Sequence, residues 1–245
     1  MGSLTSFRAN SYSQCFWLCD NNLAQWTIGL LRAYGNSICD IGIGTGYMIP
    51  FYCDVFSDIY GVDPSSHMLD KISEANHDCV NKCEIVNGTA ENLPFADNIA
   101  DISFSKSSLH HFDDINKSLM EMKRVAKRLV AVMEVIVPSD ECLPFLHEVL
   151  LRKERGRDKS TVFTERAIYE HLSKLSDNVN MLHYDQYIDT NTWLNASDLN
   201  SHEQQEIISI ISRQTGKVKR DMQIHERFGS IVMLRRMCLA IAFID

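Results

Sequence analysis

Apolar and polar residues follow a regular block pattern along the chain as far as residue 137. Five short, mostly apolar runs have the length and continuity of buried strands, at 37–42, 58–63, 83–87, 100–105 and 128–137. Three amphipathic segments between them predict helices, at about 46–55, 65–76 and 114–127. Such alternation of strands and helices indicates a parallel sheet that is covered by helices on both faces.

After Pro138 the predicted strands and helices no longer alternate regularly. Two later apolar runs predict strands, at 179–188 and 230–243, which brings the sheet to seven strands. Amphipathic segments predict helices at 139–157, at 164–176 and over about 190–215, and two helical stretches precede the first strand within 7–34. The elements together predict an α/β fold with a doubly wound, mostly parallel sheet.

The first strand ends in an acid and three glycines, Asp40, Gly42, Gly44 and Gly46. Glycines let the backbone turn sharply and approach a ligand, because no β-carbon stands in the way. Asp63 closes the next strand, where a carboxylate in a nucleotide-binding βαβ unit accepts hydrogen bonds from ribose hydroxyls. A tight connection without a ligand is the alternative. The combination favours a site for a nucleotide-type cofactor.

Charge and cysteine usage narrow the function classes. The chain of 245 residues has a net charge of -8 and a pI near 5.6, which disfavours a surface for nucleic acid or for an anionic membrane. Its eight cysteines are scattered, which is typical of a reducing compartment. No apolar run reaches the length that spans a bilayer. We therefore expect a cytoplasmic protein with neither a nucleic-acid nor a membrane partner.

Later segments identify the cofactor by resemblance. The glycine turn and Asp63 stand together with Asn87-Gly88-Thr89-Ala90-Glu91-Asn92-Leu93-Pro94-Phe95, with 100–112 and with 119–125. Over 37–137 this combination resembles class I S-adenosylmethionine-dependent methyltransferases, above all the small-molecule group that includes the ubiquinone/menaquinone-type methyltransferases. The resemblance implies a Rossmann-like fold and transfer of a methyl group from S-adenosylmethionine to a small-molecule acceptor by in-line displacement, which leaves S-adenosylhomocysteine.

The resemblance also implies roles for residues along the cofactor. Gly42, Gly44 and Gly46 would form the turn beside its amino-acid part, whose ammonium Asp40 would hold. Asp63 would bind the ribose hydroxyls.

The remaining cofactor residues would surround the adenine and the methionine portion. Pro64 and Met68 would flank the adenine, Ala90 would meet its edge through the backbone, and Ser105 would lie under the methionine portion. Thr89 stands where the family usually has an acid that binds the adenine amino group, so we expect a weaker contact or a substitute from Glu91. The family's Pro-Gly-Gly before the fifth strand is also absent, which predicts a tighter connection there.

Two groups of residues are candidates for the acceptor side. His110 and His111 follow the fourth strand, and histidine, with an ordinary pKa of about 6.5, can accept a proton near neutral pH. Structural hydrogen bonds are the alternative for this pair. Aromatic residues of the cap and the late insert, Tyr12, Phe16, Trp17 and Trp193, are candidates for the acceptor pocket, with ordinary core packing as the alternative for each.

The predicted organisation is an N-terminal helical cap over 1–36 and a methyltransferase domain over 37–245, with insertions on the substrate side at 138–160 and 190–229. Two cysteine pairs, Cys15 with Cys19 and Cys79 with Cys83, could bind zinc, but buried thiols fit their spacing better. We therefore predict no metal site. A small-molecule acceptor and a monomer or homodimer are expected. The alternative functions are methylation of protein or RNA and a non-catalytic module that binds the same cofactor.

Overall fold

The computed structural model describes residues 19–74, 82–153, 161–195, 197 and 199–244. Its central sheet has the order β3-β2-β1-β4-β5-β9-β7, and two short strands, β6 and β8, pair with β5 and β9. The strands are β1 Ser37–Ile41, β2 Asp58–Asp63, β3 Cys83–Asn87, β4 Ala100–Lys106, β5 Ala126–Val137, β6 Phe163–Thr164, β7 Val179–Asp189, β8 His225–Arg227 and β9 Ser230–Phe243. The predicted seven-stranded, doubly wound α/β sheet is confirmed, with β6 and β8 as additions.

The carboxyl ends of β1, β2 and β4 lie together at one end of the sheet, which we call the sheet edge. Strands β1 to β5 pair in parallel, whereas β9 runs antiparallel to both β5 and β7. The strand order reverses between β1 and β4, and in open parallel sheets ligands bind outside the carboxyl ends of the strands at such a point. All five residues of β1 are buried, as expected for a central strand.

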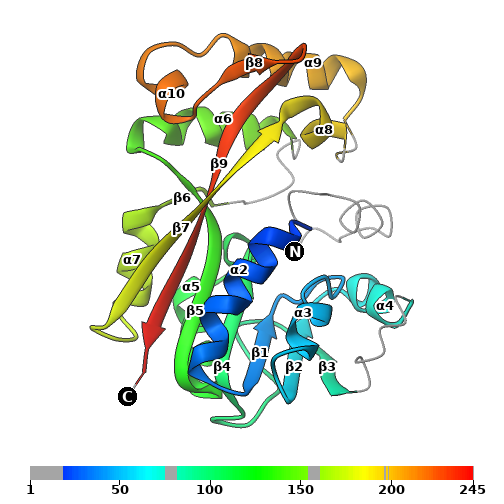
Figure 1. Ribbon diagram of the computed structural model, residues 1–245, viewed down its shortest axis with the longest axis vertical. Coiled ribbons are helices and arrows are strands. Elements are labelled where there is room, and N and C mark those ends of the chain that lie inside the picture. The colour runs from blue at the N-terminus through cyan, green and yellow to red at the C-terminus, as the bar shows by residue number, and fades with distance from the viewer. Residues whose placement is uncertain (1–18, 75–81, 154–160, 196, 198, 245) are drawn as a thin grey trace.

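Helices cover both faces of this sheet (Figure 1). On one face, Leu23 and Ile28 of α2 and Tyr52 of α3 pack against apolar residues of β1, β4 and β5. On the other face, Leu119 of α5 and Ile168 of α7 do the same. The bounds of these helices are α2 Asn21–Leu31, α3 Ile49–Cys53, α4 Ser66–Glu74, α5 Ile115–Val125 and α7 Glu165–Leu172, with one-turn helices η1 Arg32–Tyr34 and η3 Leu109–His111.

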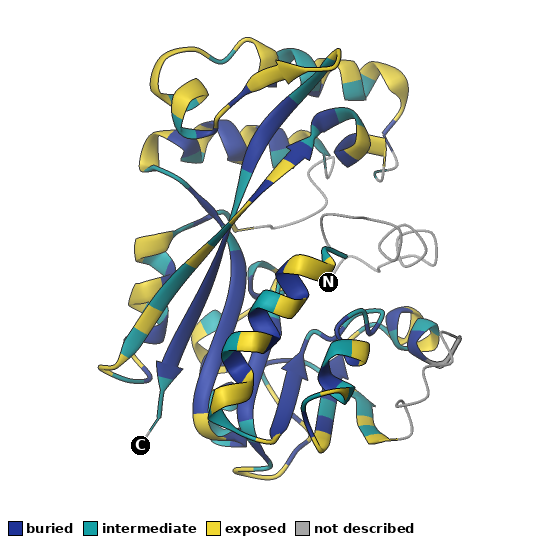
Figure 2. Cartoon of the chain, viewed as in Figure 1, coloured by how far each residue is buried: buried dark blue, intermediate teal, exposed yellow. Residues whose placement is uncertain are grey.

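A second group of helices forms a separate lobe beyond the carboxyl end of the sheet. It contains η4 Asp140–Cys142, α6 Leu143–Lys153, α8 Thr190–Asn195, α9 Ser201–Ser212 and α10 Gly216–Asp221. These helices share a buried apolar core of their own, to which Phe145, Leu194 and Ile207 contribute. Strands β7 and β9 cross from the sheet into the lobe (Figure 1), where they still pair at Asp189 and Val232. Figure 2 shows that β9 is buried along most of its length, whereas β7 is largely exposed or half-buried.

Local differences from the predicted elements have physical reasons. The helix predicted over 46–55 is shorter, because the left-handed Gly46 prolongs the turn and Pro50 lies in the first turn of α3. Helix α5 ends at Val125 and β5 begins at Ala126, so the connection without Pro-Gly-Gly contains no loop. Helix α2 is one of the two helical stretches predicted for the cap, and the other lies outside the described residues.

Candidate functional site

Strand β1 leads into a turn that is shaped by three glycines. Gly42, Gly44 and Gly46 have φ angles of 80°, 58° and 76°, in the left-handed region that glycine enters without strain. The amides of Gly42 and Ile43 donate to the carbonyl oxygen of Val62, at 2.8 and 3.1 Å, and thereby tie the turn to β2. A β-carbon built on Gly44 meets no described atom within 4 Å. The backbone at Gly44 therefore faces open space that a ligand can enter.

Asp63, at the end of β2, holds this turn in place. Its Oδ2 accepts a hydrogen bond from the amide of Gly44 and its Oδ1 accepts one from the amide of Ser65, both at 2.9 Å. Burial raises the pKa of Asp63, and these two backbone hydrogen bonds oppose that shift. Each carboxylate oxygen has a second lone pair, so the group can also accept hydrogen bonds from a pair of ligand hydroxyls.

Asp40 supplies a second acid beside the turn. Its side chain is 2% exposed, and its Oδ2 accepts a hydrogen bond of 2.7 Å from the hydroxyl of Tyr52. Within the described part of the chain, Oδ1 is buried and has no hydrogen-bond partner. Burial raises the pKa of Asp40 to about 7, while Tyr52 and the positive charge of Lys106 oppose this shift. A buried acceptor of this kind is costly unless a donor reaches it, and a ligand ammonium group would satisfy it.

Lys106, the last residue of β4, is a charged site residue that our sequence prediction missed. Its Nζ lies 5.6 Å from the centroid of the Tyr47 ring. Burial and the charge of Arg235 lower the pKa of Lys106 to about 8, against the opposing charges of Asp40 and Glu134. Lys106 is therefore close enough to interact with Asp40 on β1, with Glu134 on β5 and with Arg235 on β9.

The residues predicted around the methionine portion and the adenine occupy the same sheet edge. Ser105 is fully buried at the end of β4, and its Oγ has no hydrogen-bond partner among the described residues. Met68 on α4 is buried, whereas Pro64 before it is exposed. Their contacts with a cofactor stay a prediction.

The segment after β3 forms a compact turn. Thr89 pairs with Asn92 in an isolated β-bridge, and Ala90 is buried in the core on the α5 face. The Oε1 of Glu91 accepts hydrogen bonds from the amides of Asp113 and Asp114, at 2.9 and 3.4 Å. Glu91 thus connects this turn to the start of α5, and its proposed contact with the adenine stays a prediction.

The two histidines differ in their surroundings. Their rings lie 4.0 Å apart between centroids, but His111 is exposed and His110 is partly buried. The Nδ1 of His110 lies 2.8 Å from Oε2 of Glu134 on β5, whose side chain is 1% exposed. Glu134 was not among the predicted site residues. The structure therefore places His110 against a buried acid, and the charge of His111 also acts on Glu134 and on Asp63.

A further polar chain lies where β7 and β9 leave the sheet. Arg235 on β9 donates a hydrogen bond to Oε1 of Gln186 on β7, and Nε2 of Gln186 donates to Oδ2 of Asp20 at 2.8 Å. The Oδ1 of Asp20 caps α2 by accepting hydrogen bonds from the amides of Asn22 and Leu23. These residues are far apart in sequence, and the sequence pattern gave no indication that they would meet.

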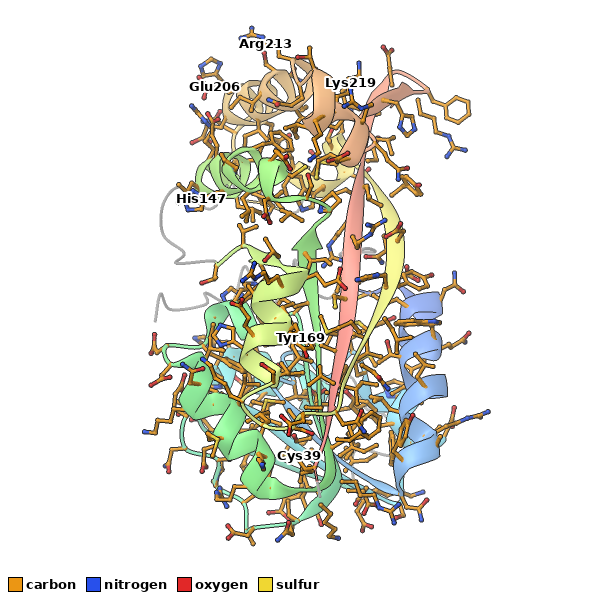
Figure 3. All side chains as sticks on the ribbon, turned by 90° about the vertical axis from the view of Figure 1, so that its left-hand side faces the viewer. Cys39, His147, Tyr169, Glu206, Arg213 and Lys219 are labelled. Carbon is orange, nitrogen blue, oxygen red and sulfur yellow. The ribbon has the colours of Figure 1, made fainter. Side chains whose placement is uncertain are left out.

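The aromatic candidates for the acceptor pocket are not gathered at this edge by the described structure. Trp193 lies in the core of the lobe, 7% exposed, and the Nζ of Lys153 lies 5.4 Å from its ring centroid. Tyr12, Phe16 and Trp17, like Cys15 and Cys79, lie outside the described residues. The outer surface of the lobe carries the exposed charged residues Glu206, Arg213 and Lys219 (Figure 3) and also the exposed ring of Phe228.

Comparison of the sequence with known proteins finds similarity to methyltransferases. Residues 39–131 match the family model described as a methyltransferase domain. An uncharacterized methyltransferase of Bacillus subtilis, YcgJ, is 32% identical over 128 residues, which cover 51% of this chain and 49% of that protein. The ubiquinone/menaquinone biosynthesis C-methyltransferase UbiE of Francisella tularensis is 31% identical over 135 residues, 47% of this chain and 54% of its own length. The chain spans about half the length of these curated relatives.

Solved structures extend the likeness in fold beyond the matched segment. The crystal structure of YcgJ superposes with a TM-score of 0.77 at 19% identity and covers 90% of this chain and 99% of that chain. Geranyl diphosphate methyltransferase in complex with S-adenosylmethionine has a TM-score of 0.56 at 12% identity and covers 89% of this chain and 84% of its own. At such identities the likeness concerns the fold. Among the described residues, no helix is long and apolar enough to cross a membrane.

Proposed function

We propose, from the match of residues 39–131 to a methyltransferase domain, that this chain is a class I S-adenosylmethionine-dependent methyltransferase that transfers the methyl group to a small-molecule acceptor. The observation that carries the proposal is the combination of a buried, unpartnered Oδ1 of Asp40 at the end of β1 with open space at Gly44 in the turn that follows. An amino-acid moiety has the ammonium donor that Oδ1 lacks among the described residues. The ribose hydroxyls have donors for the carboxylate of Asp63.

The donor set fits this cofactor better than a dinucleotide. S-adenosylmethionine has an ammonium group, a sulfonium and a ribose but no phosphate, and the edge of the sheet offers the carboxylates of Asp40 and Asp63 with the hydroxyl of Ser105. Lys106 is the cation close enough to Asp40 to influence its pKa, and we assign it to the carboxylate of the methionine portion. Ammonium and carboxylate would then each meet an opposite charge.

The residues of the chain contribute mainly by position. When bound, the sulfonium supplies an electrophilic methyl group that a nucleophile displaces in line with the carbon–sulfur bond. The glycine turn, Asp40 and Asp63 would hold the cofactor in one orientation, and positioning of this kind contributes roughly 7–11 kcal/mol of the barrier. His110 lies beyond the end of β4, and we propose that it accepts the proton of an acceptor that arrives protonated.

A small-molecule acceptor has indirect support. The matched relative UbiE is described as a C-methyltransferase of ubiquinone/menaquinone biosynthesis, and the net charge of -8 does not suit a nucleic-acid substrate. The lobe over the carboxyl edge of the sheet, which includes much of 138–160 and 190–229, is where we place the acceptor pocket. We further propose a cytoplasmic protein that acts as a monomer or homodimer.

Calorimetry with S-adenosylmethionine, S-adenosylhomocysteine and a nicotinamide dinucleotide tests the cofactor. We expect one site for each sulfur ligand, with a lower affinity in Asp40→Ala, and no binding of the dinucleotide. Binding of the dinucleotide alone would overturn the proposal.

Turnover is tested with methyl-labelled S-adenosylmethionine and a set of small phenols, quinols and amines. The variants His110→Ala and His111→Ala test the two candidate bases separately, and we expect His110→Ala to lose turnover of the accepted compound while it still binds the cofactor. Equal turnover in both variants and in the wild-type protein would remove the histidines from the mechanism.

A further inference from the structure

His110 and Glu134 form a short polar contact at the carboxyl edge of the sheet. The Nδ1 of His110, on η3, lies 2.8 Å from Oε2 of Glu134. Glu134 lies on β5 one residue beyond Met133, which is the partner of Lys106 at the end of β4. The pair therefore lies next to the end of β4, one position beyond Lys106 in the register of β5.

The carboxylate of Glu134 is fixed on both of its oxygens. Its side chain is 1% exposed, and Oε1 accepts a hydrogen bond of 2.9 Å from the amide of Val135. Burial acts to raise the pKa of Glu134, but the charge and hydrogen bond of His110 and the amide of Val135 outweigh it and hold that pKa below its ordinary value. Glu134 is thus an anion in a dry position, where an oriented imidazole can stabilise it.

Charged groups from three elements face this pair. Lys106 on β4 and Arg235 on β9 both interact electrostatically with Glu134, and His111 on η3 does so as well. Since each of them is positive when protonated, they favour the ionised form of Glu134. The carboxylate is therefore available as the acceptor of the hydrogen bond from His110.

The hydrogen bond selects one form of the imidazole. A carboxylate can only accept, so neutral His110 must place its proton on Nδ1 and its lone pair on Nε2. In free histidine the two nitrogens are not constrained in this way. The arrangement corresponds to that of a general base whose second nitrogen is oriented by an acid.

We propose that Glu134 is a positioning residue that holds His110 with Nε2 ready to accept a proton, and that the acceptor is a compound whose reacting atom arrives with a proton. The inference rests on the proposed function, because it concerns the acceptor of the same reaction. The acceptor's electron pair forms the bond to the methyl carbon, the carbon–sulfur bond breaks, and the electron pair of that bond remains on sulfur. The acceptor's proton moves to Nε2, and Glu134 stabilises the resulting imidazolium.

A second histidine–glutamate pair offers a matched control within the same chain. The Nε2 of His183 on β7 lies 3.3 Å from Oε2 of Glu165, and the two side chains are 35% and 51% exposed. Solvent screens such a contact, and it orders an exposed imidazole only weakly. The buried pair and the exposed pair can be compared in one spectrum.

The test is NMR of the imidazole nitrogens in the full-length protein, over a range of pH, for the wild type, Glu134→Gln and Glu165→Gln. We expect neutral His110 in the wild type to carry its proton on Nδ1. In Glu134→Gln we expect its titration midpoint to move to lower pH by about one unit or more, because a close opposite charge is lost. Glu165→Gln should leave His110 unchanged.

Two results would overturn the positioning role. One is a wild-type His110 that carries its proton on Nε2, which is measured without any substitution and so does not depend on the folding of a variant. The other is an unchanged His110 titration in a Glu134→Gln protein that still binds S-adenosylhomocysteine. Absence of binding of that ligand by the wild type would instead contradict the proposed function itself, so the two failures are distinguishable.

Discussion

The cofactor side of the sheet edge and the lobe beyond it are built in different ways. The cofactor side consists of one turn and the ends of β1, β2 and β4, and the backbone amides of Gly44 and Ser65 bind Asp63 there. The lobe consists of helices α6, α8, α9 and α10, which pack on each other through apolar side chains. In the first region backbone hydrogen bonds fix the positions of polar atoms, whereas the second region is an apolar core whose surface residues can vary.

This difference teaches which part of the molecule fixes the chemistry. A turn that requires left-handed backbone at three glycines tolerates few sequences, and it places the ligand against the same atoms whatever the acceptor is. An apolar core accepts many combinations of side chains of similar volume. We therefore assign cofactor binding to the sheet edge and acceptor selection to the lobe, and the following predictions separate the two.

Loss of Asp63 should have the largest effect on the cofactor side. Asp63→Ala removes the acceptor of the Gly44 and Ser65 amides and the partner of the ribose hydroxyls. Two charge-assisted hydrogen bonds of ~1.5 kcal/mol or more each correspond to a loss of affinity for S-adenosylhomocysteine of about 100-fold. Calorimetry checks this, with Asp58→Ala at the opposite, exposed end of β2 as the control. Equal affinities of the two variants would contradict the assignment.

A single methyl group at Gly44 should weaken the binding of S-adenosylhomocysteine, whereas the same change at a glycine outside the site should not. Gly44→Ala places a β-carbon in the open space of the turn, and overpacking there costs ~2 kcal/mol, or about a 30-fold loss of affinity. Gly216 has the same φ of 58° and no atom near its β-carbon position. Gly216→Ala should therefore lower the free energy of unfolding by about as much as Gly44→Ala does, because both glycines have a left-handed φ. It should leave the affinity unchanged. A loss of affinity in both variants would show that the effect of Gly44→Ala is not local.

Affinity should also depend on pH through Asp40. Its pKa of about 7 means that the anion that attracts an ammonium group forms as the pH rises. Affinity for S-adenosylhomocysteine should increase about tenfold between about pH 6 and pH 8, and Asp40→Asn should abolish this dependence. Because the folded-state pKa is raised, the same group should lower the free energy of unfolding of the ligand-free protein as the pH rises from about 4 through 7. A flat pH profile in the wild type would contradict this role.

A change within the lobe should have the smallest effect on the cofactor. Leu194 is fully buried in the lobe core, so Leu194→Ala should lower the free energy of unfolding by ~2–5 kcal/mol. Its affinity for S-adenosylhomocysteine should stay within about twofold of the wild type. Leu151→Ala, at an exposed position of α6, is the control for stability. A large loss of affinity in Leu194→Ala would show that the two regions are not separate.

Much of the fold could be predicted from the sequence, because apolar runs and glycines report on local structure. The strands at 58–63, 83–87 and 230–243 have the predicted bounds, and the acid at the end of a strand marked Asp40 and Asp63 as candidates. The predicted helix over 46–55 was too long because hydrophobic pattern does not reveal how far a glycine turn extends.

The acceptor side could not be predicted to the same extent, because tertiary contacts create it. Glu134 lies within an apolar strand and contacts His110 across 24 positions of sequence, and Arg235 meets Gln186 across 49. Periodicity says that such a charge is unusual but not which residue it will meet. The same limit applies to Trp193, which the pattern placed among pocket candidates and which the fold places in the core of the lobe.

A crystal structure of the protein with S-adenosylhomocysteine tests the central claim most directly. The account predicts that the ligand's ammonium group lies within hydrogen-bonding distance of Oδ1 of Asp40. The amino-acid part of the ligand should lie against the backbone of Gly44, and its ribose hydroxyls should bind Asp63. Its sulfur should point toward the side of the edge where His110 and Glu134 lie. A ligand bound elsewhere, or one whose ribose and ammonium avoid both carboxylates, would contradict the account.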